Sequence, residues 1–82
     1  MIWCVEDDAS IRDIEIYTLQ STGFDALGFT NSAAFWEALK TDKPDLILLD
    51  IMLPEQDGIE ILQKLRSNAD TCRIPCLLYT SP

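Results

Sequence analysis

The sequence predicts an α/β fold in which helices cover both faces of a doubly wound parallel sheet. Short apolar runs alternate with stretches whose apolar residues recur at helical spacing, which gives the order β-α-β-α-β-α-β. The run at residues 46–49 contains no charge, as is typical of a strand buried on both faces. Acidic residues directly follow two of the runs, at the sheet edge where α/β proteins bind their ligands.

The first strand is expected at Ile2–Val5, where an apolar run stops at three acidic residues. Asp8 or Ser10 can cap the helix that follows, and this helix should end near Thr22 and Gly23, where glycine supplies a left-handed residue. The helical spacing predicts that four side chains face the sheet: Ile11, Ile14, Thr18 and Leu19.

The second strand is expected at residues 24–29 and, because Gly28 interrupts it, at the edge of the sheet. A second helix at residues 33–40 follows a capping segment at residues 30–32. Its predicted apolar face consists of Ala34, Phe35, Ala38 and Leu39. After a turn at residues 41–44, the third strand runs through residues 46–49 and ends on Asp50.

Asp57 is expected to cap a third helix that runs from Gly58 to about Asn68. The predicted buried stripe of this helix consists of Ile59, Ile61, Leu62 and Leu65. A polar loop at residues 67–73 then leads to a fourth strand at residues 76–80, and no helical pattern follows it.

Composition narrows the classes of function. The 82 residues predict one small domain, and its net charge of −8 argues against direct contact with nucleic acid. The sequence has no histidine, which excludes a histidine base and disfavours zinc. The three cysteines form no CxxC motif, so we expect reduced thiols and a cytoplasmic protein. No apolar segment reaches the roughly 18 residues of a membrane span.

A cluster of carboxylates is predicted at one edge of the sheet. If the first and third strands are neighbours, Glu6, Asp7 and Asp50 converge there. Their mutual repulsion raises their proton affinities unless a cation neutralises them, and Mg²⁺ suits oxygen ligands of this kind. Asp50 could then attack phosphorus as a nucleophile and form an acyl phosphate. The alternative for residues 6–8 is a solvated acidic turn.

VEDDASIR followed by LILLDIMLPEQDG resembles the receiver domain of two-component response regulators, over essentially the whole chain. The resemblance implies a flavodoxin-like fold with strand order 2-1-3-4. It implies that Asp50 is the phosphoacceptor and that Glu6, Asp7 and Asp50 bind Mg²⁺ together with the backbone carbonyl of Met52. It also matches Thr80 to the hydroxyl residue that reorients toward the phosphoryl group.

Further matches concern the loop and the subfamily. Pro54, Asp57 and Gly58 match the loop of the family that leads into the third helix. DIMLPEQDGIEILQKLRSN resembles the OmpR/PhoB-type subfamily, whose receivers precede a DNA-binding output domain. The resemblance therefore implies a sensor histidine kinase as partner, an output domain that regulates transcription, and a receiver that is not itself an enzyme.

The sequence departs from the family after the fourth strand. The resemblance implies a fifth strand with a lysine and two more helices, so residues 1–82 are interpreted as a partial receiver domain with the fifth strand missing. We then expect an open edge at the fourth strand and a partly bare sheet face. Two interpretations of residues 76–82 stay open: CLLYTSP is either a genuine strand or one reading frame through a sequencing adapter.

Two other functions are weighed against a phosphoaccepting receiver. An aspartate-nucleophile phosphatase also carries an Asp after an apolar strand, but it needs a second Asp two residues later, where this chain has Met52. A pseudo-receiver that only binds partners is disfavoured by the intact acidic residues, although the absent lysine leaves it open.

Overall fold

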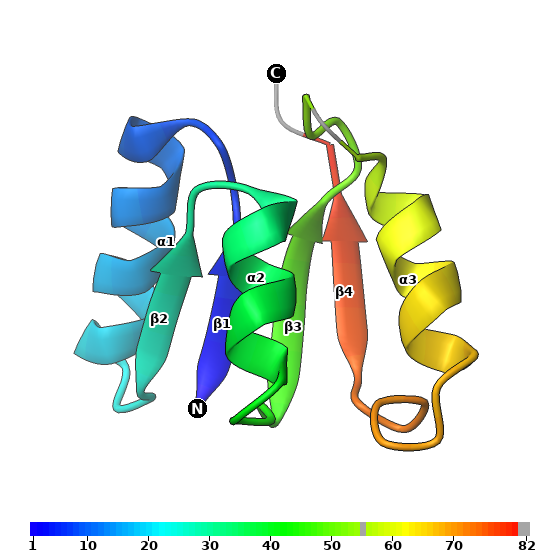
Figure 1. Cartoon of the computed structure of the whole chain (residues 1–82). Helices are drawn as coiled ribbons and strands as arrows, with labels where there is room; N and C mark the ends of the chain where they lie inside the picture. The colour runs from blue at the N-terminus through cyan, green and yellow to red at the C-terminus, as the bar shows by residue number, and fades with distance from the viewer. Residues whose placement is uncertain (55, 81–82) are drawn as a thin grey trace.

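The computed structural model describes residues 1–54 and 56–80, and its centre is a parallel sheet of four strands in the order β2-β1-β3-β4. The strands are β1 (Ile2–Val5), β2 (Ala26–Phe29), β3 (Leu46–Asp50) and β4 (Cys76–Tyr79). The helices are α1 (Ala9–Ser21), α2 (Ser32–Leu39) and α3 (Gly58–Arg66). The predicted element order, doubly wound sheet and strand order are confirmed (Figure 1).

Side chains at the start of each helix satisfy its free amide groups. The Asp8 side chain accepts from the amides of Ser10 and Ile11, so Asp8 and not Ser10 is the cap of α1. Asn31 caps α2 and Asp57 caps α3 in the same way. At the end of α1, Gly23 has a φ of 97°, as the sequence predicts for the residue that stops this helix.

The core lies on the face of the sheet that α2 and α3 cover. Every second residue of β1 and of β3 points to this face, as is usual in a strand. These side chains pack against two residues from each of the two helices. The main members are Trp3, Val5, Ile47, Leu49, Phe35, Leu39, Ile61 and Leu65. In Figure 1, α2 lies in front of the sheet and α1 behind it, so the two faces are covered by different helices.

The predicted sheet-facing side of α1 is wrong in part. Ile11 and Leu19 are half-buried as predicted, but Thr18 is exposed and Ile14 is 65% exposed. The half-buried positions instead include Glu15 and Ile16. The helix is turned this way because it packs on Gly28 of β2, where an added Cβ atom would lie 2.6 Å from Ile16 Cδ1.

The other two helices differ from the sequence expectation by single residues. Phe35 and Leu39 of α2 are buried, but Ala34 is exposed, so the prediction that it belongs to the apolar face is wrong. In α3, Ile61 and Leu65 are buried and Leu62 is half-buried, whereas Ile59 is 45% exposed. Both exposed residues lie near the amino ends of their helices.

The strands are slightly shorter than expected at the edges of the sheet. β2 begins at Ala26, and Phe24 lies outside it with 55% of its surface exposed. β4 ends at Tyr79, so Thr80 lies just beyond it. β2 is an edge strand, as its glycine predicts, and β4 is the opposite edge.

The face behind the sheet is only partly covered. In β3, Ile47 and Leu49 are fully buried against the core, whereas Leu46 and Leu48 on the opposite face are half-buried. Leu77 of β4 is 59% exposed. The expected partly bare face beneath β3 and β4 is therefore present in the described residues. Within these residues no helix has the length and apolar character required to cross a bilayer.

Candidate functional site

Glu6 follows β1 directly and is fully buried. Its Oε2 accepts a 3.0 Å hydrogen bond from the amide of Asp8, and its Oε1 accepts one of 3.0 Å from the hydroxyl of Tyr79. The Arg12 guanidinium donates to the backbone oxygen of Glu6 at 2.9 Å. Contacts from α1 and β4 thus hold this carboxylate at the carboxyl edge of the sheet.

Asp50 is the last residue of β3 and is also fully buried. Its Oδ1 accepts a 2.9 Å hydrogen bond from the amide of Met52. Asp7 is exposed in the connection between β1 and α1. One carboxylate oxygen from each of Glu6, Asp7 and Asp50 lies within 4.8 Å of the others. The predicted convergence of the three carboxylates is therefore confirmed.

The electrostatics of the cluster favour a bound cation. Burial raises the pKa of Glu6, and the nearby charge of Asp50 raises it further, against the lowering effect of hydrogen bonds from Asp8 and Tyr79. Three oxygen donors at this spacing, two of them buried, suit a small hard cation such as Mg²⁺. The residues present therefore fit this ion.

The loop after β3 is held close to Asp50 by Gly58. The amide of Gly58 donates a 3.0 Å hydrogen bond to the oxygen of Ile51, and a Cβ atom on residue 58 would lie 2.6 Å from the oxygen of Asp50. The indole nitrogen of Trp36 donates a 3.0 Å hydrogen bond to Gln56, which ties the loop to α2. Pro54 is exposed in this loop, before both of these anchors in the chain.

Two predicted site residues lie at the margin of the cluster. The Met52 side chain is 65% exposed, so only its backbone is directed toward Asp50, through the amide. Thr80 is exposed directly after β4. The roles of the Met52 carbonyl and the Thr80 hydroxyl stay predictions.

Sequence reasoning missed two residues that border the cluster. Burial raises the pKa of Glu15, as does the charge of Asp50, while a hydrogen bond with Tyr79 lowers it. Within the described residues, Glu15 Oε1 is buried without a hydrogen-bond partner. The spacing of Glu15 from Ile11 and Leu19 was the available signal, since these three residues share one face of α1. Burial also raises the pKa of Tyr79.

Comparison with known proteins identifies relatives of the whole chain. The family described as the response regulator receiver domain matches residues 2–81. The alkaline phosphatase synthesis transcriptional regulatory protein PhoP of Bacillus subtilis is 36% identical over 80 residues, which cover 98% of this chain and 32% of PhoP. The DNA-binding transcriptional regulator NtrC of Escherichia coli is 36% identical over 81 residues, which cover 99% of this chain and 17% of NtrC.

A solved structure gives the same result for the fold. The N-terminal domain of a response regulator receiver protein from Methanoculleus marisnigri JR1 superimposes with a TM-score of 0.91 at 33% identity. The alignment covers 99% of this chain and 66% of that one. This chain spans about a third or less of the two curated relatives. With its sheet order, its acidic cluster and these matches, the chain belongs to the response regulator receiver domain family of two-component systems.

Proposed function

We propose that Asp50 accepts a phosphoryl group and that the chain acts as the phosphoacceptor of a two-component response regulator. The observation that carries the proposal is the burial of Asp50 and Glu6 within one cluster of three carboxylates at the carboxyl edge of the sheet. Burying two acidic groups side by side costs stability unless a bound cation neutralises them, so the cluster is suited to hold a cation at which a phosphoryl group could also bind.

The metal ligands follow from the same geometry. Glu6, Asp7 and Asp50 would hold Mg²⁺ through carboxylate oxygens, with the Met52 carbonyl as a further ligand. When bound, Mg²⁺ supplies positive charge that offsets the repulsion between a carboxylate and the phosphoryl oxygens. Glu6 and Asp7 would hold the ion next to Asp50, and the amide of Met52 orients the Asp50 carboxylate.

The proposed reaction moves the phosphoryl group from a nitrogen donor to an oxygen acceptor. A carboxylate oxygen of Asp50 forms a bond to phosphorus while the bond from phosphorus to a phosphohistidine nitrogen of a sensor kinase breaks. The electron pair of that bond stays on the imidazole, which takes up a proton. The Thr80 hydroxyl, one residue beyond Tyr79, would then turn toward the new phosphoryl oxygens.

The consequence for the cell is a change in an output domain. PhoP and NtrC are named as transcriptional regulators, so the output proposed here is transcription. The net charge of −8 supports a receiver that does not itself contact nucleic acid. An aspartate-nucleophile phosphatase is not favoured, because Met52 stands where such enzymes need an acidic residue.

The test is phosphorylation of the chain by acetyl phosphate and Mg²⁺, followed by intact-mass measurement. In this reaction the bond from phosphorus to the acetyl oxygen breaks, acetate leaves, and the protein gains one phosphoryl group. Asp50→Asn should abolish the gain, because an amide oxygen is a poor nucleophile. Asp42→Asn is the matched control, since Asp42 is exposed and lies in the turn before β3.

The control variant should gain the same mass as the unchanged protein. Labelling that persists at full level in Asp50→Asn would overturn the assignment of the phosphoacceptor. Labelling that survives removal of Mg²⁺ with a chelator would overturn the proposed role of the metal.

A further inference from the structure

A cavity of about 360 Å³ lies between residues of α2, of α3 and of the segments that follow these helices, and no residue of the carboxylate cluster borders it. It is bordered by Trp36, Leu39 and Lys40 of α2, Lys43 of the following turn and Lys64 of α3. Its remaining border is formed by polar residues of the loop after α3, including Asp70. The volume is at the lower end of the range of about 300–1,000 Å³ that is usual for small-molecule sites.

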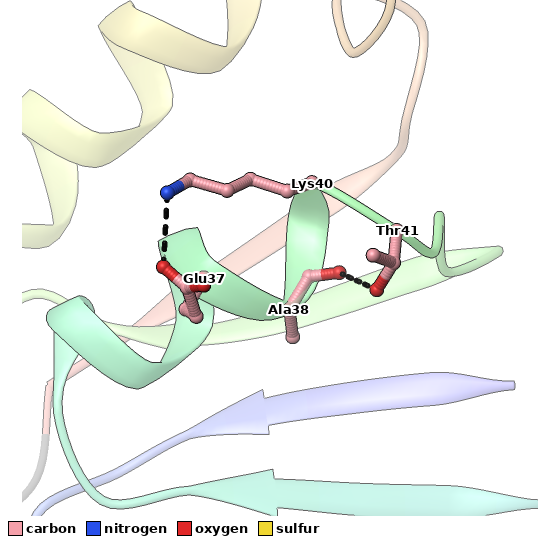
Figure 2. Close-up of polar contacts among 4 residues, drawn as sticks. All are labelled: Glu37, Ala38, Lys40 and Thr41. Atoms are coloured by element: carbon pink, nitrogen blue, oxygen red, sulfur yellow. Dashed lines mark hydrogen bonds and ion pairs between the residues drawn. The ribbon is translucent and has the colours of Figure 1, made fainter.

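The charge around this cavity is opposite to that of the protein as a whole. The chain has six lysine and arginine residues and a net charge of −8, yet three of its lysines border this one cavity. Of the acidic residues, Asp70 borders the cavity and Glu37 lies next to it, paired with Lys40 at 3.0 Å. Figure 2 shows the Lys40 side chain extended along the end of α2 to reach Glu37.

The three ammonium groups differ in how firmly they are engaged. Lys43 donates to the backbone oxygen of Leu39 and so offsets the negative end of α2. The pair of Lys40 with Glu37 is 70% and 74% exposed, and such surface pairs exchange readily with other partners. The backbone oxygen of Lys64 accepts from the Ser67 hydroxyl, but its ammonium group makes no hydrogen bond or ion pair within the described residues. Lys64 and Lys40 are therefore available to an anion that enters the cavity.

The apolar part of the border determines what kind of anion fits. Trp36 is half-buried, its ring packs edge-on against Phe35 at a centroid distance of 5.1 Å, and its nitrogen is held by Gln56. Leu39 is buried beside it. A fixed indole ring next to an aliphatic side chain favours a flat ring, while the ammonium groups favour a negative charge.

We propose that this cavity binds a small aromatic anion, with its ring against Trp36 and Leu39 and its acidic group between Lys40 and Lys64. The acidic group is a phosphate or a carboxylate, since an ammonium group pairs with either. This site is separate from the proposed phosphoacceptor, and its test does not depend on phosphorylation.

The test is a titration of the full chain followed by the fluorescence of tryptophan, with four probes. Adenosine monophosphate and 2-naphthoate carry a ring and a charge, adenosine carries the ring alone, and inorganic phosphate carries the charge alone. We expect saturable quenching by at least one aromatic anion, and weaker binding of adenosine and phosphate. Trp3 is only 3% exposed, so Trp36 is the reporter.

Two variants distinguish binding in this cavity from nonspecific attraction of an anion to any positive charge on the protein. Lys64→Gln should weaken binding of the aromatic anion about two- to fivefold, as expected for one exposed charge pair. Arg73→Gln removes the same charge from an exposed position that does not border the cavity, and it should leave the affinity unchanged. Backbone amide shifts in NMR spectra of the unchanged protein should centre on residues around Trp36, Lys64 and Thr71.

Each alternative outcome would overturn the proposal. Inorganic phosphate that binds as tightly as adenosine monophosphate would show simple charge attraction without a ring site. Equal loss of affinity in the Lys64 and Arg73 variants would show the same. Absence of saturable binding by both aromatic anions, or amide shifts centred on the carboxylate cluster, would exclude the site.

Discussion

Gly58 packs directly against the backbone of Asp50: a Cβ atom on residue 58 would lie 2.6 Å from the Asp50 oxygen and 2.9 Å from the Ile51 Cα atom. Both contacts are with backbone atoms, which cannot turn aside as a side chain can. The first residue of α3 therefore sets how closely the loop after β3 can approach the candidate phosphoacceptor.

Gly58→Ala should destabilise the protein by about 1–3 kcal/mol, despite the better helix propensity of alanine, because it forces the Asp50 backbone to move. Gly28→Ala is the matched control. Its added Cβ would meet the flexible side chains of Ile16 and Arg12, so a smaller loss is expected. Urea unfolding measures both, and a Gly28 variant that loses more stability than the Gly58 variant would contradict this account.

The raised pKa of Glu6 predicts how Mg²⁺ binding depends on pH. Because burial raises the pKa of Glu6, protons compete with the metal for this carboxylate. The affinity for Mg²⁺ should therefore fall as the pH decreases from 7 toward 5. Isothermal titration calorimetry at several pH values measures the affinity for Mg²⁺. An affinity that rises on acidification would contradict the proposed competition between protons and the metal.

The variant Glu6→Gln tests how the charge of this buried carboxylate affects the stability of the folded protein. A raised folded-state pKa contributes stability that is fully present below the unfolded pKa and is lost as the pH rises through the folded pKa. At neutral pH without metal, Glu6→Gln should thus stabilise the folded state by roughly 1 kcal/mol and move the unfolding curve to higher temperature. The variant should also lose most of the stabilisation by Mg²⁺. Exposed Asp13→Asn serves as the charge-matched control and should change neither quantity much.

The different burial of Cys4 and Cys72 predicts the order in which these thiols react. Its side chain is fully buried in β1, and burial together with the Glu15 carboxylate raises its pKa to about 12. Cys72 is less buried and lies in the loop after α3. At pH 8, iodoacetamide should modify Cys72 first and Cys4 only upon unfolding, as peptide mapping can follow. Modification of both at equal rates would mean that β1 opens readily.

The exposed Leu77 predicts the behaviour of the 82 residues on their own. β4 is an edge strand with 59% of Leu77 exposed, and the sheet face behind β3 and β4 is partly bare. We expect broad thermal unfolding, self-association and binding of a dye that reports apolar surface. Leu77→Lys should reduce association and dye binding. A sharp cooperative melt from a monomer that binds no dye would show that the core is sufficient as it stands.

The order of elements and the carboxylate cluster could be predicted from the sequence because both depend on strong local signals. An uncharged run ending on Asp50, and another ending on Glu6, place both carboxylates at the same edge of any parallel sheet. The cap at Asp57 and the stop at Gly23 are equally local, since each depends on one residue type at one turn.

The sheet-facing side of α1 could not be predicted in the same way. Ile14 and Glu15 are adjacent, and helical spacing allows either to face the sheet with Ile11 and Leu19. Hydrophobicity favoured Ile14, but the close approach of α1 to Gly28 turns Glu15 and Ile16 inward. This contact joins residues far apart in the chain, so no local pattern contains it. The spacing of Glu15 from Ile11 and Leu19 was a local signal for its position, but Ile14 fits that spacing as well, so the contribution of Glu15 to the site was missed.

The position of β1 in the sheet has a consequence for synthesis of the protein. Ile2 pairs with Ala26 on one side and with Leu46 on the other, so the strand made first is the one that needs partners on both sides. A growing chain cannot complete this pairing until β3 has left the ribosome. Until then Trp3 and Val5 have only one neighbouring strand. Nascent β1 therefore stays open on one side until β3 emerges, and the time between the emergence of β2 and that of β3 sets how long it stays accessible.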